Sequence, residues 1–388
     1  MPPLTHRKAL LLLIFSHFSV DLFGSFLAPL QPFLIEKHHL SLTQAGLLVS
    51  LYSISASLLQ PVYGYWADKL GRRFFVILAP LVVGTFMSML LLVSNYWLLM
   101  LCLFVGGIGV AAFHPQASSL SHSVSGNRKG LGMSLFISGG NIGSAVGPLY
   151  LIFFMQTFGT DSTYLAALPA IVLSLILMVY CPELPRLSSP LKLTELFKEV
   201  NRWAGSLGSL YFIVVFRTFV QLSFITFIPV LLNQMNLPPI YIGAAVTSLT
   251  GFGALGGLVG GFLYDRVGGR NLFLISSIAA PLFLFLAVTL QSPIFIIVNV
   301  AIAGFFLMMT IPVSVLMGQS IVPNAISTIS SLMMGFGWGV GGMLVPLAGR
   351  FADLTSIQQT LRILAFFPLL YAILAWRLPG KQQAALAI

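Results

Sequence analysis

His17 and Asp21 are the two residues whose types and spacing point most directly to chemistry. They stand four positions apart inside an apolar stretch, and residues at positions i and i+4 share one face of a helix. A carboxylate in partly dry surroundings binds protons readily, and histidine titrates near neutral pH. The pair is predicted to bind and release a proton; the structural alternative is that Asp21 anchors a backbone or hydroxyl group.

Arg217 and Gln221 repeat this spacing in the second part of the chain. Arg217 falls inside an apolar run, where an ionised group costs roughly 2.5 to 3.5 kcal/mol. A guanidinium there can hold an anionic group of a substrate or pair with Asp21. A purely structural buried pair is the alternative.

His114 directly precedes Pro115 in a third apolar run. Proline removes a backbone hydrogen bond and bends a helix, so His114 is a candidate for sensing protonation or binding substrate, with a packing histidine as the alternative. Two imidazoles and one carboxylate on separate helices form only a loose ligand set, so no metal site is predicted. Further candidates for contact with a substrate are Gln116, Asn141 and, in a Gly-rich run, Trp338.

The composition identifies the elements that must position these side chains. Of 388 residues, 57% are hydrophobic and 7% charged, with a mean hydropathy of +0.98. In a soluble protein about a quarter of the residues would be charged, so the chain is predicted to be an integral membrane protein. The net charge of +10 falls in short gaps between apolar runs and does not indicate a nucleic-acid partner.

Motifs of other function classes are missing from the sequence. Cys102 and Cys181 support neither a disulfide framework nor a metal site. There is no phosphate-binding loop for ATP and no grouping that suggests a catalytic nucleophile. We therefore expect no cofactor and no enzymatic activity.

A membrane span needs about 20 apolar residues, and the sequence offers enough such runs for an all-α bundle. The first run, 9–35, is too long for a signal peptide and lacks its cleavage site. Strands of an outer-membrane barrel would be only about ten residues long. Twelve spans are predicted, at 8–35, 43–67, 73–94, 96–121, 130–158, 163–181, 206–233, 240–264, 271–290, 293–318, 325–351 and 359–378.

Lys and Arg residues between the spans set the orientation. With a cytoplasmic N-terminus, fifteen of them lie on the cytoplasmic side and three on the other side. Because positive residues stay in the cytoplasm, both termini are predicted to be cytoplasmic.

The stretch Gly64–Arg73 recurs as Gly261–Arg270 at an offset of 197 residues. Pro115 and Pro312 share that offset, and Pro148 matches Pro346 at an offset of 198. These matches predict two parallel repeats of six helices. The expected parts are an N-terminal half at 1–181, a cytoplasmic linker with a possible interfacial helix at 182–205 and a C-terminal half at 206–388.

The repeated stretch resembles the signature loop of the major facilitator superfamily, and this resemblance covers the whole chain. It implies a transporter with two pseudo-symmetric halves, in which the first, fourth, seventh and tenth helices line a central cavity. Asp21 and Arg217 would then face each other across that cavity. Residues of the two loops would form a conformational latch: Gly64, Asp68, Gly71, Arg72, Arg73, Asp265 and Arg270. For the basic residues among them, positive charge that sets the membrane orientation is an alternative explanation.

Four other stretches resemble the fosmidomycin resistance family of proton-driven efflux transporters: Ser16–Asp21, Ser57–Pro61, Phe113–Ser118 and Gly139–Pro148. The glycine pair that begins at Gly143 also resembles a motif of exporters that exchange substrate for protons. A small residue at every fourth position is, however, common in helix packing.

Together these observations predict a proton-coupled secondary transporter in the inner membrane of a bacterium. It would export a small polar or amphiphilic organic molecule by alternating access and, by resemblance, act as a monomer. Three alternatives remain open. They are an importer of a nutrient or metal chelate, a transporter of a divalent metal, and a transport-dead sensor that signals to a partner.

Overall fold

The computed structural model describes residues 6–63, 66, 73–125, 129–181, 203–289, 292–322, 329–330 and 332–378. This part of the chain is helical and contains no strand. The first half comprises α1 (His6–Gly24), α2 (Leu27–His38), α3 (Leu42–Ser53), η1 (Ile54–Leu58), α5 (Phe74–Ser88), α6 (Tyr96–Val124), α7 (Lys129–Phe158), η2 (Thr160–Ala167) and α8 (Leu168–Tyr180).

The second half repeats this order of long helices. Its elements are α10 (Ala204–Gln234), α11 (Pro239–Val267), α12 (Gly269–Thr289), α13 (Pro293–Met308), α14 (Thr310–Ile321), η4 (Leu332–Phe336), α16 (Gly337–Met343), α17 (Val345–Leu354), α18 (Ile357–Leu364) and α19 (Pro368–Trp376).

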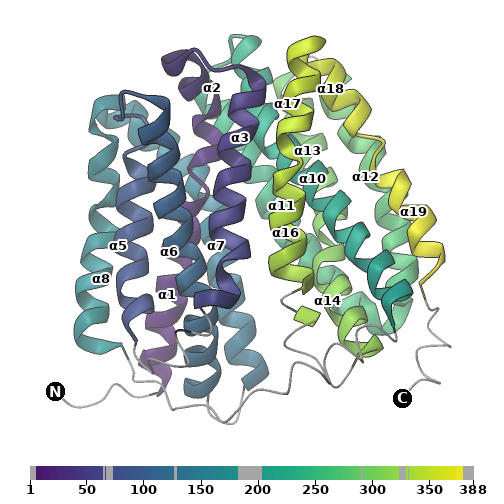
Figure 1. Ribbon diagram of the computed structural model, residues 1–388, viewed down its shortest axis with the longest axis horizontal. Coiled ribbons are helices and arrows are strands. Elements are labelled where there is room, and N and C mark those ends of the chain that lie inside the picture. The colour runs from purple at the N-terminus through teal and green to yellow at the C-terminus, as the bar shows by residue number, and fades with distance from the viewer. Residues whose placement is uncertain are drawn as a thin grey trace.

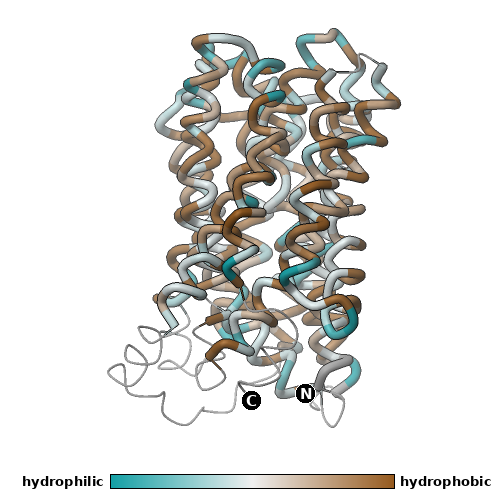
Figure 2. Tube along the Cα trace, turned by 90° about the vertical axis from the view of Figure 1, so that its right-hand side faces the viewer, coloured by the Kyte–Doolittle hydropathy of each residue, from teal (hydrophilic) through white to brown (hydrophobic). Residues whose placement is uncertain are grey.

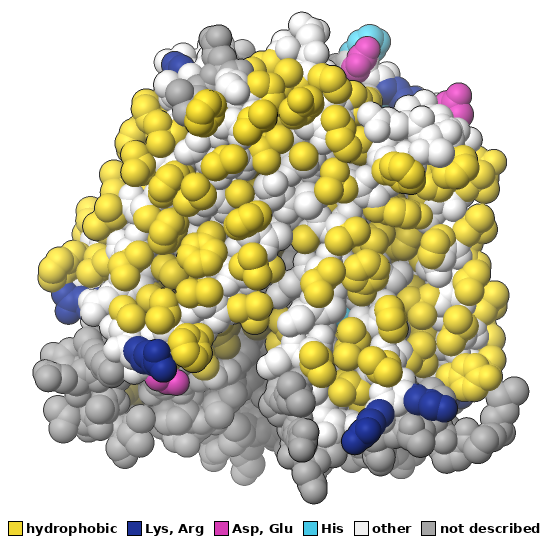
Figure 3. Space-filling view, turned by 180° about the vertical axis from the view of Figure 1, so that it is seen from behind, with side chains coloured by type: hydrophobic (Ala, Val, Ile, Leu, Met, Phe, Trp, Pro, Cys, Tyr) yellow, Lys and Arg dark blue, Asp and Glu magenta, His cyan; other side chains and the backbone are white. Residues whose placement is uncertain are grey.

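These elements form twelve membrane helices, as the sequence predicts. Within the described residues, eleven are long and apolar enough to cross a membrane, and the remaining one, Phe74–Ser88, is shorter than the predicted span because the chain turns at Met89. Figure 3 shows hydrophobic side chains over the middle of one face and charged side chains near its two ends. This distribution suits a protein surrounded by lipid.

The two halves stand side by side with their helices roughly parallel (Figure 1). Helix α1 begins at the lower end of the bundle in Figure 1, and brown, apolar segments run along the helices in Figure 2. We call the other end the distal end.

The first span is broken between α1 and α2, shortly after Asp21. Pro29 has no backbone N–H to bond the carbonyl of Ser25, so the helix loses one interior hydrogen bond at this place. The chain turns at residues 25 and 26. The backbone N–H of Ser25 donates to the backbone carbonyl of Asp21 at 3.1 Å, and its hydroxyl donates to the backbone carbonyl of Leu22 at 2.7 Å. Asp21 therefore lies in the last turn of α1.

A stripe of glycines on α7 brings that helix directly against α1. Cβ atoms added at Gly139, Gly143 or Gly147 would meet backbone carbonyls of α1. Small residues at every fourth position allow such close contact between membrane helices. The glycine pair at 143 and 147 therefore has a packing role, and α7 forms one wall beside His17 and Asp21.

Contacts between the two halves are tight at the distal end, where α3 packs against α17. A Cβ added at Gly46 would lie 2.8 Å from the backbone of Pro346, and one added at Gly349 would meet the backbone of Leu42. Asp353, near the end of α17, accepts hydrogen bonds from the first residues of α3. The halves are thus joined at the distal end, opposite the start of α1.

Candidate functional site

His17, Asp21 and His114 meet between α1 and α6. Nε2 of His17 lies 3.3 Å from one carboxylate oxygen of Asp21, and Nε2 of His114 lies 3.6 Å from the other. The rings of the two histidines are 5.1 Å apart in an edge-on arrangement. The structure thus brings together all three residues that the sequence suggested for proton coupling, although 93 positions separate Asp21 from His114.

A backbone carbonyl on α7 orients His17. Nδ1 of His17 lies 2.8 Å from the carbonyl oxygen of Phe136, and the two rings stack with centroids 4.2 Å apart. A carbonyl can only accept a hydrogen bond, so Nδ1 must carry the proton. In the neutral ring, Nε2 then presents a lone pair to the carboxylate of Asp21. Two acceptors that face each other favour a cation between them.

Gly140 leaves the room that this arrangement needs. A Cβ at this position would lie 2.6 Å from Oδ2 of Asp21 and also against Nε2 of His17. Phe136 and Gly140 were not identified as site residues from the sequence. The Gly139–Gly140 pair is a sequence signal for close helix packing at this place. The hydrogen bond to the backbone carbonyl of residue 136 has no signal in the sequence.

The cluster is partly open to its surroundings. The side chain of His17 is 9% exposed, that of Asp21 19% and that of His114 27%. A small ion can therefore reach the carboxylate and His114, while His17 forms the inner wall.

Arg217 lies on α10 and is 1% exposed. Its guanidinium donates to Oε1 of Gln221 at 3.2 Å and to the hydroxyl of Thr218 at 3.1 Å, and it lies 5.7 Å from the centre of the Trp338 ring. Asp21 pairs with the two histidines, and no ion pair joins it to Arg217. Within the described residues the guanidinium thus has neutral partners.

The two neutral candidates occupy different places. Gln116 is 1% exposed and its Oε1 accepts the backbone N–H of Val76 on α5 at 3.0 Å, so in this conformation it joins two helices of the same half. Asn141 is exposed on α7. Ala145, one turn further on, faces Gly251 on α11, so Asn141 is on the side of α7 that faces the other half.

The latch prediction falls only partly on described residues: Gly64, Asp68, Gly71 and Arg72 lie outside them. Arg73 donates a hydrogen bond to the carbonyl of Cys181, which ties the start of α5 to the end of α8. In the second copy, Asp265 is exposed near the end of α11, and Arg270 lies 4.5 Å from the centre of the Trp376 ring.

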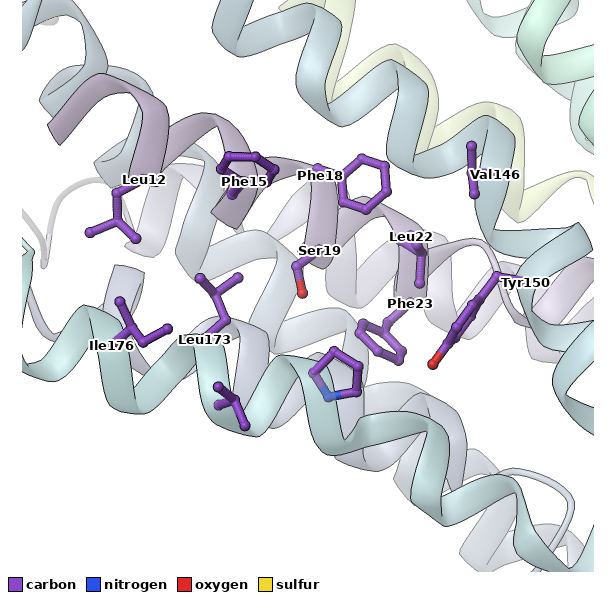
Figure 4. Close-up of a pocket in the computed structure, with 12 residues that line it drawn as sticks. Leu12, Phe15, Phe18, Ser19, Leu22, Phe23, Val146, Tyr150, Leu173 and Ile176 are labelled. Atoms are coloured by element: carbon purple, nitrogen blue, oxygen red, sulfur yellow. The ribbon is translucent and has the colours of Figure 1, made fainter. Parts of the chain in front are cut away.

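A cavity of about 600 Å³ lies apart from these groups, between α1, α7 and α8. Its lining is almost entirely apolar, with Phe18 and Leu22 on one side and Leu173 on the other (Figure 4). Ser19 is one of its few polar residues. The lining offers few polar groups that could select a polar substrate, so the charged clusters are the better candidates for the site.

Comparison with known proteins agrees with this architecture. The chain is 29% identical over 366 residues to the fosmidomycin resistance protein of Escherichia coli K12, covering 92% of this chain and 89% of that protein. It is 26% identical to the multi-drug resistance efflux pump PmrA of Streptococcus pneumoniae, with 86% of each chain covered. A solved bacterial homolog of the human lysosomal transporter Spinster, in an inward-facing and unoccupied conformation, superposes with a TM-score of 0.81 at 17% identity, covering 98% of both chains.

The family model described as Major Facilitator Superfamily matches residues 13–346. This match covers most of the chain and includes His17, Asp21, His114 and Arg217. The chain belongs to the Major Facilitator Superfamily and is a membrane transporter.

Proposed function

We propose that the protein is a proton-coupled secondary transporter that exports a small polar or amphiphilic organic molecule by alternating access. The observation that carries this proposal is the cluster of His17, Asp21 and His114. A transporter this poor in charge places one carboxylate and two imidazoles together in the middle of its first and fourth spans. The efflux roles named for its relatives favour the outward direction.

The driving proton binds between Nε2 of His17 and the carboxylate of Asp21. Its arrival turns two facing acceptors into a hydrogen-bonded pair and neutralises the net negative charge of the cluster. His114, on the more exposed side, relays the proton between water and the carboxylate. Membrane potential alone contributes about 2.3 kcal/mol per charge per 100 mV.

Arg217 binds an anionic or strongly polar group of the substrate. Its guanidinium is buried among neutral partners, so a substrate anion would supply the missing negative charge. Trp338, which lies 5.7 Å from the guanidinium, and Asn141, on the side of α7 that faces the other half, would contact the rest of the molecule. Because Arg217 is 1% exposed, the halves must rearrange before it meets the substrate.

The remaining parts of the proposal concern placement. The chain lies in the inner membrane of a bacterium as a monomer, with both termini in the cytoplasm. The halves correspond to 1–181 and 206–388, joined by the linker 182–205. The structure begins α10 at Ala204, close to the second boundary.

The test is an untargeted comparison of small molecules in cells and medium. Cells express the native chain, the Asp21→Asn variant, the control Asp161→Asn or an empty vector; Asp161 is exposed in η2. A compound that accumulates outside with the native chain and the control, but not with Asp21→Asn, would support coupled export. Uptake from the medium would instead indicate an importer, and no difference from the empty vector would favour the sensor.

A further inference from the structure

We propose that His17, Asp21 and His114 also form a binding site for one divalent transition-metal ion, with Zn²⁺ the best-suited ion. This inference goes beyond the proposed function, because it requires neither a substrate nor a direction of transport. It differs from the expectation from the sequence, where two imidazoles and one carboxylate, spread over two helices, form too loose a ligand set to predict a metal site.

The donor atoms are close enough for one ion. One ligand atom from each of the three residues can be chosen so that all three lie within 4.8 Å of one another. Around zinc, nitrogen and oxygen donors about 2.0 to 2.2 Å from the metal lie roughly 3.3 Å apart. Nε2 of His17 lies 3.3 Å from one carboxylate oxygen of Asp21 and Nε2 of His114 lies 3.6 Å from the other, so each histidine is already near this spacing from one oxygen of the carboxylate.

The widest separation must shorten by at most about 1.5 Å to complete a tetrahedral set. His114 can supply this movement, because its side chain is 27% exposed and Pro115 interrupts the hydrogen bonding of α6 beside it. A water molecule that enters from the more exposed side, beside His114, would provide the remaining ligand.

His17 is already oriented as a metal ligand. Its Nδ1 donates to the carbonyl oxygen of Phe136, which leaves the Nε2 lone pair directed at Asp21. Metal-bound histidines commonly donate their other nitrogen to a carbonyl in this manner. Two imidazoles and one carboxylate are ligands that zinc prefers, whereas Mg²⁺ requires oxygen ligands.

The charge of the cluster also suits a cation. Asp21 supplies one negative charge, and in the described residues its ion-pair partners are the two histidines, which are neutral when they bind a metal. The ion would occupy the lone pairs that accept the driving proton. If the proposed function is correct, Zn²⁺ therefore inhibits transport by excluding that proton.

The experiment uses the full chain purified in detergent with an affinity tag that contains no histidine. Isothermal titration with Zn²⁺ should show one saturable ion per chain, and an excess of Mg²⁺ should not compete. Asp21→Asn and His114→Gln should each weaken binding by at least about tenfold. The matched control is His122→Gln, an exposed histidine on the same helix, which should bind as the native chain does.

Co²⁺ provides a second readout, because tetrahedral ligation by nitrogen and oxygen gives visible absorption that His114→Gln should lose. If Asp21→Asn fails to fold, His114→Gln decides the outcome alone. Native affinity in His114→Gln, or an equal loss in His122→Gln, would overturn the proposal. Zinc binding by a chain that transports nothing would uphold it and reject the proposed function, whereas coupled transport without zinc binding would do the reverse.

Discussion

Substitution of Asp353 by Asn should weaken the distal contact between the two halves. One carboxylate oxygen of Asp353 accepts the backbone N–H of Leu42 at 2.8 Å. The other accepts the backbone N–H of Thr43 at 2.9 Å and its hydroxyl at 2.5 Å. A side chain from α17 thus caps the start of α3, more than three hundred residues away.

The size of the effect follows from these contacts. A negative charge at a helix N-terminus is worth about 0.3 to 1 kcal/mol at an exposed site. Asn keeps one acceptor for the two donors of Thr43 and turns its NH2 group toward the N–H of Leu42, so one hydrogen bond is also lost. Asp353 is exposed, so water and salt screen the charge. We expect a loss of about 1 kcal/mol, which raises the population open at the distal end about fivefold.

Distances between spin labels test this expectation. Labels on cysteines replacing Trp97 and Leu354 report on the two halves, since both side chains are exposed, at 77% and 66%, and the native cysteines are buried. The variant should shift the distance distribution toward longer values. Asp161→Asn removes an equal charge elsewhere and should not. An unchanged distribution in Asp353→Asn, or the same shift in the control, would refute the reasoning.

Three further predictions concern the site and its supports. Gly140→Ala should displace His17 and Asp21 and lower proton-coupled transport at least about tenfold, whereas Gly208→Ala, which has open space around it, should leave transport unchanged in the same vesicle assay. Gly143→Ala should destabilise the α1–α7 contact by about 1 to 3 kcal/mol, seen as a lower midpoint of thermal unfolding in detergent, and a native midpoint would contradict this packing role. Arg217→Lys should raise the KM for an anionic substrate more than it lowers kcat, because lysine keeps the positive charge but loses the two separate N–H donors of the guanidinium. A change in kcat alone would argue against a role of Arg217 in substrate binding.

The sequence alone was sufficient for the membrane architecture. Long apolar runs and two related halves depend on composition and short-range spacing, which a linear reading captures. The orientation inferred from Lys and Arg stays a prediction. The closeness of His17 and Asp21 also follows from their spacing on one helix. The predicted first span is one continuous run, whereas in the structure α1 ends shortly after Asp21 and α2 follows. The sequence contains the local cause of this break, which is Pro29.

Contacts between helices were decided by the tertiary structure. His114 could have faced lipid, a neighbouring helix or the cavity, and only the packing of α6 against α1 directs it to Asp21. Gln116, two positions later, turns instead to the backbone of α5. The capping of α3 by Asp353 left no pattern in the sequence, because it joins an ordinary helix start to an ordinary acidic residue.

The physical reason is that hydropathy and helical spacing act within one segment, whereas the site depends on how segments are rotated and shifted against each other. The glycines of α7 set that register by allowing α1 to approach its backbone, which brings the carbonyl of Phe136 to His17. A backbone carbonyl has the same chemistry at every residue. Its role at position 136 therefore exists only in the folded protein, while the histidine and the carboxylate it serves could be named from the sequence.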